Sequence, residues 1–170
     1  METFWQRLDL WARASVPTVL GLLFTFLSAS LWPFPYLGNV MPPLAFFALF
    51  YWSAHRPDLF PPFVAFFIGL LNDFIGGNAL GLSALLYTVA QQLILRYRSF
   101  FTGHSFFMLW VGFTLSAIIM MLVQWIVLSL LSWQLIPFLP VLIQILLAVV
   151  FFPLPCWIFI QLQRTVLSST

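Results

Sequence analysis

Asp73 is the residue of this chain that is best placed to do chemistry, because it is a carboxylate at the end of an apolar segment. The other acids, Glu2, Asp9 and Asp58, lie on segments that also carry arginines. A carboxylate inside a membrane is costly unless it is hydrogen-bonded, protonated or in contact with water. The position of Asp73 therefore requires an explanation.

Three hypotheses explain Asp73. It can accept hydrogen bonds from Asn78, or from the free backbone N–H groups at the start of the next helix, and so hold a helical hairpin together. It can face a membrane helix of another protein. It can also be a proton or solute site. We favour the first hypothesis, and the residues alone leave the other two open.

Small residues surround Asp73. Gly69 precedes it by one helical turn, while Gly77 and Gly81 have the spacing of two small residues four apart. We expect these glycines to let backbones approach closely, either inside the protein or against a partner helix. Asn78 is expected to cap the start of the helix that follows.

Ser83, Tyr87 and Gln91 recur every four residues and predict a polar stripe along one helix face. Such a stripe should face protein or a wet cavity, because lipid offers no hydrogen bonds. Gln124 and Gln144, in two later apolar segments, are candidate partners across the bundle. These residues complete the set of structural or partner-contact candidates.

An enzyme is not indicated by the remaining reactive side chains. No carboxylate lies close in sequence to His104, and neither a nucleophile elbow, a phosphate-binding loop nor a metal-ligand spacing accompanies His55 or His104. A single cysteine, Cys156, excludes an internal disulfide and a Cys-rich metal site. We therefore predict no catalytic, cofactor-binding or metal-binding residues.

The composition places these residues in a membrane. Hydrophobic residues make up 63% of the 170 residues and charged residues 6%, far below the charged share of a soluble domain, which is about 25%. The formal net charge of +2 is too small to form a nucleic-acid-binding surface, so this class of partner is excluded. The sequence predicts an all-α integral membrane protein.

Six apolar windows are long enough for a transmembrane helix, which needs roughly 17 to 25 residues. The third window opens at Pro61 and Pro62, and the sixth should bend because it contains Pro153 and Pro155. We expect one transmembrane domain over residues 1–170. Its windows lie near 14–32, 37–54, 60–76, 79–97, 104–131 and 137–162.

The arginines predict the orientation. They fall before the first window, between the second and third, at the end of the fourth and directly after it, and after the sixth. Basic residues favour the cytoplasmic side, so we expect a compact bundle of about six transmembrane helices with both termini inside. Ser28-Ala29-Ser30 could also end a cleavable signal peptide, but the aromatic-rich residues 31–35 favour an interfacial anchor.

The third and fourth windows resemble the rod-shape-determining protein family MreD. The resemblance rests on residues 63–73, with Gly69 and Asp73, and on residues 77–82. Residues 49–52, 55–57 and 97–100 add further matches, and the length and number of windows also agree.

The resemblance implies a non-enzymatic scaffold of the bacterial cytoplasmic (inner) membrane that helps organise lateral peptidoglycan synthesis. Its implied partners are an MreC-like bitopic membrane protein and, in the same complex, MreB, RodZ, RodA and a penicillin-binding protein. The MreD family is also similar to substrate-binding subunits of vitamin transporters. A small-solute-binding membrane subunit of such a transporter is therefore the alternative function.

Overall fold

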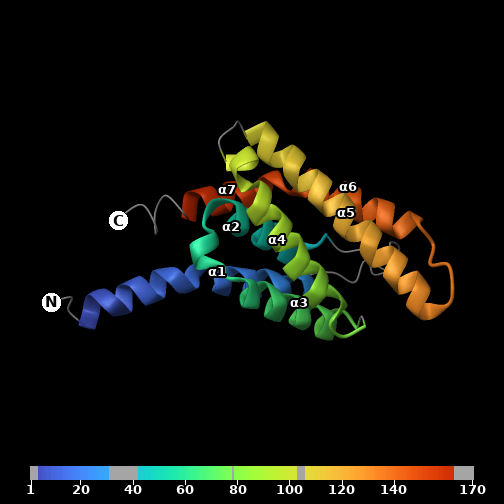
Figure 1. The fold of residues 1–170 in the computed structure, drawn as a ribbon, viewed down its shortest axis with the longest axis horizontal. Helices are drawn as coiled ribbons and strands as arrows, with labels where there is room; N and C mark the ends of the chain where they lie inside the picture. The colour runs from blue at the N-terminus through green and yellow to red at the C-terminus, as the bar shows by residue number, and fades with distance from the viewer. Residues whose placement is uncertain (1–3, 31–41, 78, 103–105, 163–170) are drawn as a thin grey trace.

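The computed structural model describes residues 4–30, 42–77, 79–102 and 106–162, and the regular structure in these ranges is entirely helical. The prediction of an all-α protein is confirmed. Figure 1 shows the order of the helices along the chain. They are α1 (Phe4–Ser30), α2 (Leu44–His55), the short 3-10 helix η1 (Pro57–Leu59), α3 (Pro62–Gly76), α4 (Leu82–Thr102), α5 (Phe106–Ser132), α6 (Leu139–Phe151) and α7 (Pro153–Leu162).

Proline and glycine set the helix ends that matter for the arrangement. Helix α3 begins at Pro62, where a missing N–H costs no helical hydrogen bond. It ends at Gly76; the N–H of the capping residue Gly77 donates to the carbonyl oxygen of Asp73, and the left-handed φ of 65° at Gly77 turns the chain out of the helix. Pro153 separates α6 from α7, and the two helices meet at an angle of 40°, as the prolines predicted.

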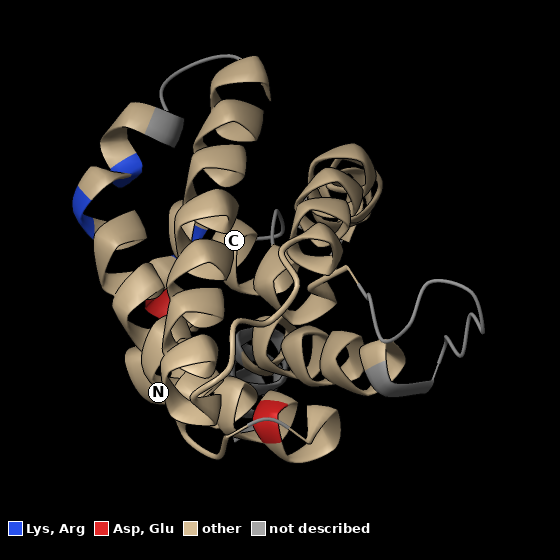
Figure 2. Cartoon of the chain, turned by 90° about the vertical axis from the view of Figure 1, so that its right-hand side faces the viewer, with Lys and Arg blue, Asp and Glu red and all other residues tan. Residues whose placement is uncertain are grey.

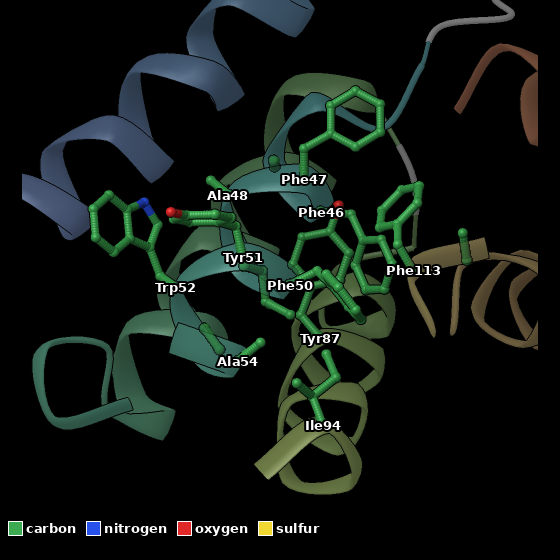
Figure 3. Packing of buried hydrophobic residues seen from close by; sticks show 14 of the residues in the cluster. Phe46, Phe47, Ala48, Phe50, Tyr51, Trp52, Ala54, Tyr87, Ile94 and Phe113 are labelled. Atoms are coloured by element: carbon green, nitrogen blue, oxygen red, sulfur yellow. The ribbon is translucent and has the colours of Figure 1, made fainter. Parts of the chain in front are cut away.

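Helix α2 is the centre of the fold. Residues 45–54 are all buried, and α2 packs against α1, α3, α4 and α7. Figure 3 shows its side chains projecting in several directions, with Phe46 and Phe50 near Phe113 and Trp52 on the side of α1. A helix that is apolar on every face is expected to be buried in this way.

Aromatic rings join α2 to α5 and to the C-terminal end of the bundle. Phe113 of α5 stacks on Phe152 with ring centroids 4.0 Å apart and planes 9° apart. Phe47 and Phe50 of α2 contact both of these rings at centroid distances between 5.3 and 6.1 Å. Such tilted and edge-on contacts are favourable geometries for aromatic pairs. The cluster fixes how α5 lies against the core.

The outer surface suits lipid. Large apolar side chains such as Phe74, Leu130 and Val150 are exposed, and charged positions are sparse in Figure 2. Among the described residues, α5 has the length and composition to cross a membrane unbroken, and α6 with α7 makes a second candidate if the bend lies within one span. Helix α2, with 12 residues, measures about 18 Å and is shorter than a hydrocarbon core of about 30 Å.

Candidate functional site

The carboxylate of Asp73 joins α3 to the start of α4. Its Oδ2 accepts hydrogen bonds from the backbone N–H groups of Gly81 at 3.0 Å and Ser83 at 2.9 Å, and its Oδ1 lies 3.1 Å from the Ser83 nitrogen. The side chain is fully buried. Because the first N–H groups of a helix have no partner within the helix, a carboxylate is well suited to satisfy them. This is the geometry of the first hypothesis for Asp73.

At Gly69 the backbones of α3 and α4 lie close together. A Cβ atom at this position would lie 2.5 Å from the Cα of Ala84 and 2.6 Å from the carbonyl oxygen of Ser83. Both neighbours are backbone atoms, which a side-chain rotation cannot move away. The absence of a side chain at Gly69 therefore allows α3 to lie against the start of α4, where Asp73 bonds.

Gly77 and Gly81 do not bring two backbones together within the described part of this chain, and their contact with a partner helix stays a prediction. Apart from its neighbours in the chain, no described residue has an atom within 4 Å of a Cβ placed at either glycine. Both precede α4, and their φ angles of 65° and 94° are conformations that other residues rarely adopt. These glycines shape the turn instead. Asn78, the expected helix cap, lies outside the described residues.

The polar stripe of α4 faces the protein interior. Ser83, Tyr87 and Gln91 are all buried, at 3% exposure or less. The Ser83 hydroxyl accepts a hydrogen bond of 3.4 Å from the side-chain amide of Asn72. Gln91 Nε2 donates to the carbonyl oxygen of Phe60 at 2.6 Å and so attaches α4 to the segment that precedes α3. The stripe therefore avoids lipid.

A cavity of about 410 Å³ lies beside this hairpin and extends to α5 and α6. Tyr87 from the stripe lines it, and so do Gln124 of α5 and Gln144 of α6, which come from separate helices. The structure therefore places the two glutamines around one cavity. Ser83 and Gln91 do not belong to its lining.

Sequence reasoning did not select three further polar residues of the cavity, Thr25, Ser28 and Asn72. The hydroxyls of Thr25 and Ser28 donate to carbonyl oxygens one turn earlier in α1, at 2.8 and 2.9 Å. Apolar helices often contain two small polar residues near one end. The spacing of Thr25 and Ser28 therefore does not identify them as cavity residues. The position of Asn72 directly before Asp73 was the one feature of the sequence that could have marked any of these three residues as part of the site.

Reactive groups do not gather elsewhere in the part of the chain that the structure describes. No group of three or more His, Cys, Asp or Glu side chains is arranged there to hold a metal ion. His55 stacks on Tyr51 with ring centroids 4.3 Å apart, and its Nδ1 lies 3.1 Å from the Tyr51 carbonyl oxygen. His104 lies outside the described residues. The Asp73 hairpin and the adjoining cavity are therefore the features to relate to function.

The family model of the rod shape-determining protein MreD matches residues 11–165. The chain belongs to the MreD family. The match includes the Asp73 hairpin and every residue that lines the cavity. MreD membership identifies a membrane protein with a role in rod-shape determination. No significant match was found among curated proteins or solved structures.

Proposed function

We propose that this MreD-family chain is a non-enzymatic, multi-pass scaffold of the bacterial inner membrane. It binds an MreC-like bitopic protein and helps organise lateral peptidoglycan synthesis in a complex with MreB, RodZ, RodA and a penicillin-binding protein. The observation that carries this proposal is the family match over nearly the whole chain. The buried aromatic core around α2 supports it, because a scaffold needs a rigid shape.

The topology belongs to the same proposal. Six crossings of the membrane, with both termini in the cytoplasm, form one transmembrane domain over residues 1–170. The arginine positions support this orientation, because basic residues are enriched in the cytoplasmic segments of membrane proteins. The short α2 then lies within the bundle, in contact with α1, α3, α4 and α7.

In this proposal, the residues of the hairpin stabilise the arrangement of α3 and α4 and so the surface that the MreC-like protein binds. Asp73 and Gly69 hold α3 against α4, and Gly77 and Gly81, with their positive φ angles, shape the turn before α4. A capping role of Asn78 at the start of α4 is part of the same proposal. The inward-facing stripe then holds α4 against its neighbours through Ser83, Tyr87 and Gln91.

Depletion of the protein in rod-shaped cells tests the proposal. Cells should become round, and the tagged protein solubilised from the membrane should co-isolate with the MreC-like partner. The control is re-expression of the unaltered chain, which should restore rods. Cells that stay rod-shaped, together with co-isolation of a paired ATPase module and saturable vitamin binding, would instead support the transporter subunit.

A further inference from the structure

The cavity beside the Asp73 hairpin is large enough for a small ligand. Its volume of about 410 Å³ falls within the range of roughly 300 to 1,000 Å³ that is typical of small-molecule sites. It is lined by α1, α3, α4, α5 and α6, so several packed helices contribute to it. Such a space is a feature of the tertiary packing and not of one helix surface.

The polar groups that the described residues bring to the cavity are all uncharged. They come from Thr25, Ser28, Asn72, Tyr87, Gln124 and Gln144, and no charged side chain is among the described residues that line it. Asp73 follows Asn72 in sequence, but it is fully buried and its oxygens accept backbone hydrogen bonds. A charged ligand group would therefore find no opposite charge here, and its transfer from water would be costly.

Gln124 is available for a ligand. Its amide makes no hydrogen bond within the part of the chain that the structure describes, although it lines a cavity between apolar helices. An amide supplies two donors and an acceptor. Asn72 and Gln144, from α3 and α6, bring further amides to the same space. These groups suit a partner with several hydroxyl or amide groups.

The remaining wall is apolar. Met120, Met121 and Trp125 of α5 line the cavity next to Gln124. Methionine side chains adapt to irregular ligand shapes, and an indole offers a broad apolar surface. The wall thus complements an apolar body attached to the polar groups.

We propose that this cavity binds an uncharged amphiphile whose hydroxyl or amide groups lie among Asn72, Gln124 and Gln144 and whose apolar part lies along α5. The polar group can belong to a membrane lipid or to a free solute, and the chemistry of recognition is the same. This ligand site goes beyond the scaffold role and does not depend on it.

The test uses the purified full-length protein in a detergent without a sugar headgroup. Native mass spectrometry compares retention of monoglucosyldiacylglycerol with that of phosphatidylglycerol carrying the same acyl chains, and methyl glucoside is the free solute. We expect the neutral glycolipid to be favoured by about tenfold, as two well-placed hydrogen bonds would produce. Retention of the glycolipid alone assigns a lipid ligand, and retention of methyl glucoside as well assigns recognition of the free polar group.

Variants locate the binding. Gln124→Leu combined with Gln144→Leu should remove the preference, whereas the matched change Gln92→Leu, at an exposed position of α4 outside the cavity, should preserve it. If the double variant does not fold, Gln124→Leu alone serves, because it leaves no partner unpaired within the described residues. Equal retention of the two lipids, or a preference that persists in the folded variant, would overturn the proposal.

Discussion

Ser83 of α4 donates its backbone N–H to the carboxylate of Asp73 on α3, with the nitrogen 2.9 Å from Oδ2 and 3.1 Å from Oδ1. Gly81 donates to the same carboxylate from the turn before α4. Both donors are backbone groups at a helix start, which hydrocarbon cannot satisfy. One side chain therefore provides the hydrogen bonds that allow a tight turn between two apolar helices.

Replacement of Asp73 should separate the structural hypothesis from a charge-dependent one. Asp73→Leu leaves the partly buried N–H of Gly81 and the buried N–H of Ser83 without their acceptor. An unsatisfied buried group such as that of Ser83 costs about 1–3 kcal/mol. We expect low membrane abundance or loss of co-isolation with the MreC-like partner. Asp73→Asn keeps one acceptor oxygen but turns an NH₂ group toward a donor, so we expect partial cell-shape complementation.

Membrane abundance and thermal unfolding in detergent measure these effects. Asp58→Asn is the matched control, because Asp58 is exposed and its contact with Arg56, at 3.3 Å, is a surface ion pair of small effect. Normal abundance of Asp73→Asn with complete loss of complementation would contradict the hairpin hypothesis. It would indicate a proton carrier or a counter-charge to a partner.

Gly69→Ala should destabilise the contact between α3 and α4. The added methyl group would lie 2.5 Å from the Cα of Ala84, so the helices must separate, at a cost of about 1–3 kcal/mol. Gly77→Asn is the comparison, since asparagine tolerates a positive φ and the surrounding space is open. The unfolding temperature should fall clearly for Gly69→Ala and little for Gly77→Asn. Equal shifts would refute this assignment of the two glycines.

Gln91→Ala should weaken the attachment of α4 to the segment before α3. The change removes the 2.6 Å hydrogen bond to the Phe60 carbonyl oxygen and leaves a buried space. We expect a loss of about 1–3 kcal/mol in unfolding free energy. Gln92→Ala removes the same side chain from an exposed position, and its unfolding temperature should stay close to that of the unaltered protein. If both variants lost the same unfolding free energy, the hydrogen bond of Gln91 to Phe60 would not contribute measurably to stability.

The orientation is tested by cysteine labelling in intact cells. Single cysteines at Asn39, Asn78 and Gln134 should react with a membrane-impermeant reagent, and one at Arg98 should not, because arginines mark the cytoplasmic side. The native Cys156 is buried and should contribute little background. Lysed cells provide the control, since Arg98→Cys should then react. External labelling of that variant in intact cells would overturn the six-span arrangement.

The amino-acid sequence by itself predicts the helical fold class, the membrane environment and the family of this protein. Its apolar windows and scarcity of charge specify helices in lipid, because each unpaired backbone group in hydrocarbon is costly. The isolated carboxylate at Asp73 and the four-residue spacing of Ser83, Tyr87 and Gln91 predict inward-facing polar groups from local periodicity alone. The same local sequence around Gly69 and Asp73 carries the resemblance to the MreD family.

Packing decided the features that join separate helices. Gly69 and Gly77 are the same residue type a few positions apart, but their surroundings differ. A Cβ at Gly69 would collide with the backbone of Ala84, whereas a Cβ at Gly77 would lie in open space. Gln124 and Gln144 border one cavity because α5 and α6 are rotated and inclined so that both residues face it. Crossing angles and helix rotations depend on how side chains from different helices interlock, and no periodicity within a single helix encodes them.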